Sequence, residues 1–392
     1  MIRHERRKSV RGSWWLAIGA ALVAVVFVVV NVDVARRGVL LGGDSGRYTG
    51  GAQSLLAGEP LDDRQRLYAG YVALVALADE LGVGLDGVVA IQIALIALGA
   101  LALFDLGRQL AGPWVGLLAA ALFVTSPDLT RFTGWQAFIL TDAPYASALA
   151  IAVWAIHRAG VRRGRWYVAG AILVVFAASL RPQGWWLLPA ALIYWVVPRM
   201  RTGRSRIISA AVVAVAFLAV VALAPGQAGN TAAASPDKAL REGLVIYDSS
   251  DWRVSMPGEG PSGRQGWGDV AYYAVRHPIA GLRVAATRIA VEAAHARPFY
   301  TARRNAIIIG YLIPLYALAA IGLATWWREP VVRLAAALIA LHLALVAAFF
   351  ADYDGRWLVH VLPLVGLLAA LGCASIARSL ARARSRRVRS VG

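Results

Sequence analysis

The stretch "WWLAIGAALVAVVFVVVN" (residues 14–31) decides the class of fold. It carries no charged side chain, and about 20 apolar residues at 1.5 Å rise each are what a helix needs to cross a bilayer. The stretch resembles the apolar core of a signal peptide. Because no cleavage site of small residues follows it, we expect a retained membrane span.

The composition extends this interpretation to the whole chain. Of its 392 residues, 59% are hydrophobic and 16% are charged, against about 25% charged in soluble domains. Apolar runs of similar length recur along the sequence, at 14–32, 86–106, 112–126, 138–157, 166–180, 183–198, 207–224, 305–327, 331–350 and 357–377. We therefore predict a single all-α membrane domain over residues 1–392, a polytopic transmembrane helix bundle of about ten spans.

The positive charge predicts how this bundle is oriented. The net charge is +18, and arginines gather at both ends of the chain and in the loops 157–166 and 198–206. Basic segments stay on the cytoplasmic side, and ten spans place all four there. We expect a multi-pass plasma-membrane protein with both termini cytoplasmic. The basic segments then face anionic lipid, and no soluble face is left to bind nucleic acid.

The same orientation places two long loops, 33–85 and 225–304, outside the cell. Within the first, the apolar segment 67–81 is too short to span comfortably and would break the parity, so we expect it to be re-entrant or interfacial. Within the second, apolar residues recur at helical spacing while Arg288 and Glu292 lie elsewhere on the helix. This pattern indicates an interfacial amphipathic helix with the apolar positions Leu282, Ala286, Ile289 and Ala293.

The first candidate for chemistry is Asp44, just past the first span in "GGDSGRYTGGAQSLLAGEP" (residues 42–60). The apolar spacing predicts a short helix over 45–57 that Gly58 and Pro60 end. Asp44 or Ser45 then stands at the N-cap, where a side-chain oxygen accepts a backbone N–H. The flanking glycines allow close backbone approach, and an acid at the membrane boundary can act as a general base. Both interpretations of Asp44 stay open.

A second acid, Asp142 in "LTDAPYASALA", opens a predicted span from the same side. Pro144 in the first turn makes N-capping an adequate explanation. However, parity places Asp142 on the same face as Asp44. Two such carboxylates can bind a metal or share acid–base work, so the sequence leaves a divalent cation open without assigning any cofactor.

Arginines on the outer side run against the positive-inside bias. Arg181 in "SLRPQGWW" and Arg356 in "DYDGRWLVHVLPL" each lie where a span meets the outer surface. They either extend toward the headgroups or bind a lipid phosphate, whose oxygens suit a guanidinium fork. Further candidates are weaker: Arg64, Arg66 and Arg131 for a phosphate, Trp185 for a sugar or the interfacial belt, and Asp354 and His360, with Asp352, as a polar cluster beside Arg356.

These motifs resemble the membrane glycosyltransferases of the GT-C type, such as protein O-mannosyltransferases, aminoarabinose transferases and related bacterial enzymes. The family pattern runs from an acid through a Tyr to a Gly before Pro, and here those positions are Asp44, Tyr48, Gly58 and Pro60. "LTDAPYASALA", "SLRPQGWWLLPA" and "DGRWLVHVLPLVGLLAALG" are similar to its second acidic site, its Arg-Pro turn and the Arg before its final span.

The resemblance implies transfer of a sugar from a polyprenyl-phosphate donor to a hydroxyl of a cell-envelope glycan, lipid or protein on the extracytoplasmic face. Asp44 would be the general base and Asp142 a second acidic site, for acceptor or metal. Arg181 and Arg356 would hold the donor phosphate. Many relatives carry a second acid directly after the first, where this chain has Ser45. The chain also lacks a large C-terminal soluble domain, so the acceptor would be recognised by the outer loops, chiefly 225–304.

Two other functions fit parts of the pattern. A lipid or solute transporter or flippase would need acids within spans, and here the main one is Asp105 beside Arg108. A polymerase or ligase for polyprenyl-diphosphate glycans would need a more basic outer loop than 225–304. No P-loop motif is present, which argues against ATP-driven transport.

Overall fold

The computed structural model describes residues 2–127, 137–162, 164–196, 236–246, 252–258 and 267–391. Helices dominate this part of the chain, and its extended segments pair only in isolated bridges such as Leu40 with Phe138. The predicted all-α class is confirmed.

The bundle consists of helices that follow the predicted apolar runs. They are α1 (Ile2–Arg37), α5 (Gly84–Ala111), α6 (Pro113–Val124), α7 (Asp142–Arg162), α8 (Arg165–Leu180), the 3-10 turn η2 (Pro182–Trp186), α9 (Leu187–Val196), α14 (Ala302–Trp326), α15 (Pro330–Ala348) and α16 (Arg356–Val391). Within the described ranges, five helices are long and apolar enough to cross a membrane, in α1, α5, α14, α15 and α16. A polytopic bundle is thus confirmed, while ten spans stay a prediction. The predicted span 207–224 lies outside the described residues.

Helices α7 and α16 form the centre of the bundle. Small residues let α7 pack closely on its neighbours, and its Ala146, Ala150 and Val153 are fully buried. Along α16, most residues from Leu358 to Leu371 are buried as well. Where α14 crosses α16, a Cβ on Gly322 or Gly372 would strike a backbone carbonyl of the other helix. Close helix contact through small residues is typical of membrane bundles.

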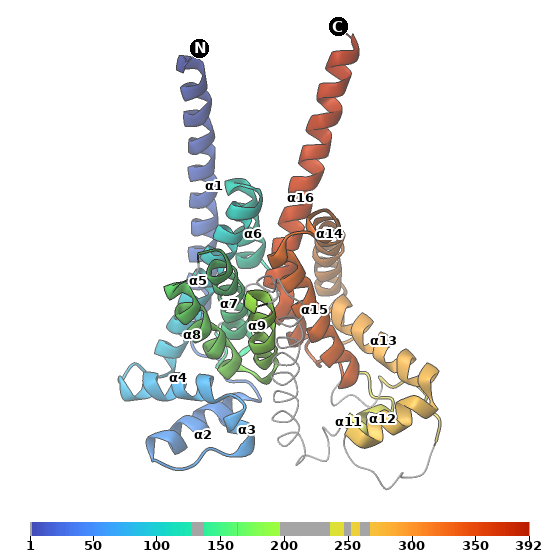
Figure 1. Cartoon of the computed structure of the whole chain (residues 1–392). Coiled ribbons are helices and arrows are strands. Elements are labelled where there is room, and N and C mark those ends of the chain that lie inside the picture. The colour runs from blue at the N-terminus through green and yellow to red at the C-terminus, as the bar shows by residue number, and fades with distance from the viewer. Residues whose placement is uncertain are drawn as a thin grey trace.

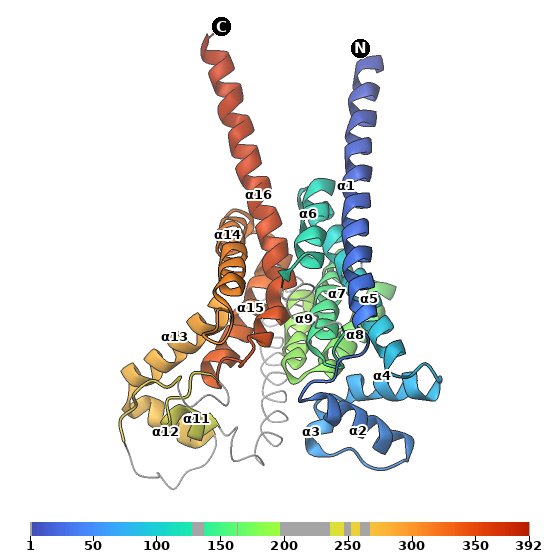
Figure 2. The same ribbon diagram turned by 180° about the vertical axis from the view of Figure 1, so that it is seen from behind.

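Both termini lie at one end of the bundle, at the top of Figure 1 and again in the reverse view of Figure 2. An even number of crossings requires this arrangement, as the charge pattern predicted. Helix α1 runs along the edge with 6% of its most apolar window buried. Its apolar surface is suited to lipid contact.

At the opposite end, short helices gather in two groups (Figure 1). One group follows α1 and contains α2 (Ser45–Leu56), α3 (Asp63–Arg66) and α4 (Ala69–Glu80). The other contains α11 (Pro236–Arg241), α12 (Trp267–Arg276) and α13 (Pro278–Ala294). Helix α4 has 12 residues and lies across the end of the bundle rather than along it. Its length and direction suit the interfacial placement that we expect.

Helix α13 is the predicted amphipathic helix, and it begins at the expected Pro278. Its apolar side faces outward, with Ile279 83% and Leu282 71% exposed. The side that faces the protein carries Val284, Arg288 and Glu292, all fully buried, so two charged side chains point inward. In water this arrangement would be unfavourable. At a lipid interface it is expected, because there the outer surface is the apolar one.

Candidate functional site

Asp44 lies in the connection between α1 and α2, one residue before α2 begins. Its backbone is in the helical region and its side chain makes no capping hydrogen bond. The capping role considered for Asp44 is therefore wrong. Ser45 instead fixes this connection, since its Oγ accepts from Gly42 N at 2.8 Å and donates to Ile139 O at 3.0 Å. The carboxylate of Asp44 is left for other partners.

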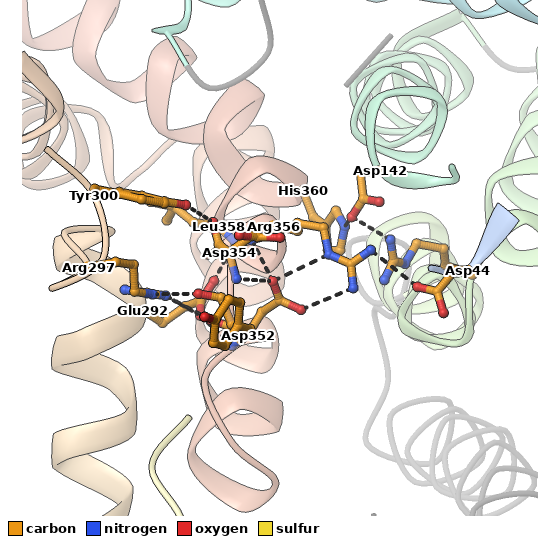
Figure 3. Close-up of polar contacts among 12 residues, drawn as sticks. Asp44, Asp142, Glu292, Arg297, Tyr300, Asp352, Asp354, Arg356, Leu358 and His360 are labelled. Carbon is orange, nitrogen blue, oxygen red and sulfur yellow. Dashed lines mark hydrogen bonds and ion pairs between the residues drawn. The ribbon is translucent and has the colours of Figure 1, made fainter. Parts of the chain in front are cut away.

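The principal partner of Asp44 is Arg356, the first residue of α16 (Figure 3). Arg356 Nη1 lies 3.2 Å from Asp44 Oδ2, and the two side chains are 22% and 31% exposed. Arg47, in the first turn of α2, lies 3.3 Å from the other oxygen of Asp44. On its far side, Arg356 approaches Asp352 with Nε and Nη2 at 3.4 Å. One guanidinium therefore joins two carboxylates that are 308 positions apart in the chain (44 and 352).

Asp142, at the start of α7, has different surroundings. Its Oδ1 accepts a hydrogen bond of 2.6 Å from Arg181 Nη1, and His360 Nε2 lies 3.0 Å from the same oxygen. The Asp142 side chain is 1% exposed and that of Arg181 is 7% exposed. Arg181 directly follows the last residue of α8. Asp142 is thus held inside the protein by two partners.

Helix α16 connects the two acids. Arg356 and His360 are four residues apart, so they lie on one face of the helix. The first meets Asp44 and the second meets Asp142 (Figure 3). The structure therefore brings together Asp44, Asp142, Arg181, Arg356 and His360. The sequence placed the first four on one side of the membrane and His360 in a polar cluster beside Arg356.

Two further predicted residues lie near this cluster. Tyr48 is buried in α2, and its hydroxyl is 3.5 Å from that of Thr141. Burial raises the pKa of the Tyr48 hydroxyl above its usual value, so it stays neutral. The backbone of Asp354 donates to Asp352 Oδ2 at 3.0 Å and its carbonyl accepts from Tyr300. Burial, and then Asp352, raise the pKa of the Asp354 carboxyl.

The remaining predicted residues lie elsewhere. Arg64 and Arg66 belong to α3, which buries no residue. Arg66 is 3.4 Å from Asp63 in the same helix. Trp185 is half-buried in η2, and Arg131 lies outside the described residues. The cluster described above therefore does not depend on these residues.

Glu292 and Arg297 belong to the polar network but were not candidates from the sequence. Glu292 accepts backbone hydrogen bonds from Asp352 N at 2.9 Å and Leu358 N at 2.8 Å. Its carboxylate lies 3.6 Å from Arg297 Nη2, and both side chains are fully buried. Burial, with a contribution from Asp352, raises the pKa of Glu292 to about 7. The one available signal was its place on α13, opposite the apolar positions.

Asp105, the acid that a transporter would need, is already paired. Arg108 Nη2 lies 2.7 Å from its Oδ1, Arg158 contacts its Oδ2, and Trp154 donates to it at 2.8 Å. This arrangement fits the ion pair that the sequence suggested. Among the described residues, no group of three or more His, Cys, Asp or Glu is arranged to hold a metal ion. Asp44 and Asp142 each pair with an arginine instead.

Comparison with known proteins places part of the chain in a family context. Residues 70–224 match the family model described as dolichyl-phosphate-mannose-protein mannosyltransferase. This match supports, over that part of the chain, the resemblance drawn from the sequence. The matched range contains Asp142 and Arg181, whereas Asp44 and Arg356 lie outside it.

One solved structure is similar over most of the chain. It is ArnT from Cupriavidus metallidurans in the apo state, with 15% sequence identity and a TM-score of 0.47. The similarity covers 92% of this chain and 60% of that one, so this chain spans about three fifths of that protein's length. No curated protein sequence matches this chain.

Proposed function

We propose that this protein transfers a sugar from a polyprenyl-phosphate donor to a hydroxyl acceptor at the extracytoplasmic membrane surface. The family match supports the class of enzyme. The observation that carries the proposal is the pair formed by Asp44 and Arg356, 3.2 Å apart and partly exposed. The pair joins the start of α16 to the connection between α1 and α2, away from the ends of α1 and α16 that carry the termini. Such a transfer needs a general base next to a residue that binds the donor phosphate.

Asp44 is the better candidate for the general base. A base must reach the proton it removes, directly or through one water. With 31% of its side chain exposed, Asp44 can meet an acceptor hydroxyl. Asp142 is 1% exposed and is engaged by Arg181 and His360. We assign Asp142 a positioning role, because it ties α7 and α8 to the helix that carries Arg356.

Arg356 is the better candidate for binding the donor phosphate. It is more exposed than Arg181, which is 7% exposed and bound to Asp142. Its present partners are carboxylates, and a phosphate offers the same oxygen geometry to a guanidinium fork. A donor phosphate can therefore take the place of one carboxylate and leave Asp44 ready to accept a proton.

The reaction then follows from these two roles. The acceptor oxygen attacks the anomeric carbon of the sugar and loses its proton to Asp44. The bond between that carbon and the phosphate oxygen breaks, and polyprenyl phosphate leaves with the electron pair. Arg356 stabilises the negative charge that develops on the departing phosphate.

The test is the substitution Asp44→Asn in purified protein, assayed with the polyprenyl-phosphate sugar that accumulates in membranes lacking the protein. Asn keeps the size of the side chain but cannot take up a proton. We expect transfer to fall by about 100-fold or more, with an unchanged elution profile and melting temperature. Asp63→Asn, at an exposed acid in α3, is the matched control. Full activity of Asp44→Asn would contradict the assignment of the base.

A further inference from the structure

The connection between α15 and α16, residues 349–355, directly precedes Arg356. Its geometry is set by Asp352, whose Oδ2 accepts from Asp354 N at 3.0 Å and from Arg356 N at 3.1 Å. The same carboxylate also contacts the Arg356 guanidinium. The position of Asp352 therefore determines the position of the Arg356 backbone and which groups the Arg356 side chain can contact.

Glu292 of α13 holds this connection from outside. Its Oε2 accepts from Asp352 N and its Oε1 accepts from Leu358 N, at 2.9 and 2.8 Å. Leu358 lies in the first turn of α16, and its N–H also donates to Gly355 O at 3.2 Å. The Glu292 carboxylate is therefore a second, closer acceptor for this N–H, and it interacts favourably with the helix dipole. The Glu292 side chain thus binds one residue before Arg356, Asp352, and one residue after it, Leu358.

Arg297 also binds the connection between α15 and α16. It donates from Nη2 to Asp352 O at 2.9 Å and from Nε to Tyr353 O at 3.0 Å. Its charge lies 3.6 Å from that of Glu292. The buried carboxylate therefore has a cation beside it, and both members contact the same short connection (Figure 3).

Arg288 anchors α13 one turn earlier. It is fully buried and donates to Ala347 O at 2.9 Å and Ala348 O at 3.1 Å, at the end of α15. It also donates to Leu244 O and Ala239 O, at 2.8 and 2.9 Å. Arg288 thus binds the end of α15, and Glu292 binds the connection after it. Helix α13, whose outer face is apolar, therefore fixes the connection between α15 and α16 that precedes Arg356.

We propose that Glu292 is a positioning residue for sugar transfer, because it fixes the 352–358 segment so that the Arg356 guanidinium lies beside Asp44. The proposal rests on the function proposed above for Asp44 and Arg356. Glu292 acts on Arg356 through its hydrogen bonds to the backbone N–H groups of Asp352 and Leu358.

The test compares Glu292→Gln with the matched control Glu242→Gln at pH 8, in the purified full chain. Gln keeps the shape of Glu but places an N–H₂ group against one of the two backbone N–H groups. Glu242 is a half-exposed acid whose partners are Lys238 and Arg253. Hydrogen–deuterium exchange is followed in the peptide that contains residues 352–358, and kinetics are measured with the polyprenyl-phosphate sugar.

We expect exchange in this peptide to be about tenfold faster in Glu292→Gln and KM for the donor to rise about tenfold, with a smaller change in kcat. Glu242→Gln should leave both unchanged. Unchanged exchange, or faster exchange with unchanged kinetics, would overturn the proposal. If Glu292→Gln does not fold, Glu292→Asp replaces it, since Asp keeps the charge but is one methylene shorter. Absence of transfer by the wild type would instead count against the proposed function, while exchange would still report whether Glu292 holds the segment.

Discussion

The Asp44–Arg356 and Asp142–Arg181 pairs combine the same side chains in opposite environments. The first is partly exposed, at 31% and 22%, and its atoms lie 3.2 Å apart. The second is almost completely buried, at 1% and 7%, with atoms 2.6 Å apart. Water can compete for the first pair but not for the second. The difference indicates which pair can exchange a partner for a substrate and which maintains the framework.

The comparison also explains how one helix can serve both purposes. Arg356 and His360 reach the two acids from neighbouring turns of α16. The deeper contact fixes α16 against α7, and the outer contact then lies at a defined place on the surface. Removing the deep pair should therefore affect folding, whereas removing the outer pair should affect transfer.

The largest expected effect is on stability, from Asp142→Ala. This change leaves the buried Arg181 without its carboxylate, and breaking a buried ion pair costs about 3–5 kcal/mol. Thermal unfolding in detergent should show a much lower melting temperature. Asp79→Ala, at an exposed acid of α4, serves as the control. Equal melting temperatures for the two variants would mean that the deep pair does not maintain the framework.

A double variant tests whether the loss of stability comes from a buried charge left without a partner. In the double substitution Asp142→Asn with Arg181→Gln, no uncompensated charge remains, so part of the stability should return. We expect it to recover about 2 kcal/mol relative to the single change Asp142→Asn. The measurement is again thermal unfolding, of both single variants and the double. An additive result would show that the two residues are energetically independent.

The pH dependence of stability tests the network behind Arg356. Burial and Asp352 raise the pKa of Glu292 to about 7, against the opposing effects of Arg297, His295 and the Asp352 N–H. In the unfolded chain Glu292 loses its proton near its ordinary pKa, whereas in the folded protein it keeps it until about 7. Stability from this group is therefore full below its ordinary pKa and is lost as the pH rises through 7.

We expect a loss on the order of 2 kcal/mol between pH 5 and pH 8 from Glu292. Melting temperatures across this range should fall less in Glu292→Gln than in the wild type. Identical profiles would show that Glu292 does not take up a proton on folding.

The smallest expected effect is the stability change from Asp44→Ala. Exposed ion pairs contribute about 0–1 kcal/mol, so the melting temperature should change by only a few degrees while transfer is lost. A destabilisation as large as that of Asp142→Ala would remove the distinction between the two pairs. The comparison is made in the same detergent and at one pH.

Much of the fold was predictable because lipid imposes a simple rule. A chain must satisfy its backbone internally to cross a bilayer, so apolar runs identify helices and basic loops predict their direction. The starts of α2 and α13 followed from local spacing in the same way. The sequence left Asp44 or Ser45 open as the N-cap residue of α2. The structure places Asp44 at that position without a side-chain capping hydrogen bond, and Ser45 Oγ bonds to Gly42 N and Ile139 O.

The candidate site was only partly predictable. Its acids and arginines were found because charges at the outer ends of spans are few. The sequence did not identify Glu292 as a candidate, because its position on α13 is the same as that of any acid on the polar side of an interfacial helix. Its partners, the amides of Asp352 and Leu358, are backbone groups that every residue has. No side-chain pattern can identify such a contact.

The sequence by itself determined a helical membrane protein, the end of the bundle at which its polar residues gather, and the residue types available there. Tertiary structure alone decided which acid meets which arginine, and which pair stays near water. The reason is physical: hydropathy and charge act along the chain and follow from each segment separately. Burial and pairing arise only when α16 packs between α7 and the connection before α2, and these determine what a carboxylate can do.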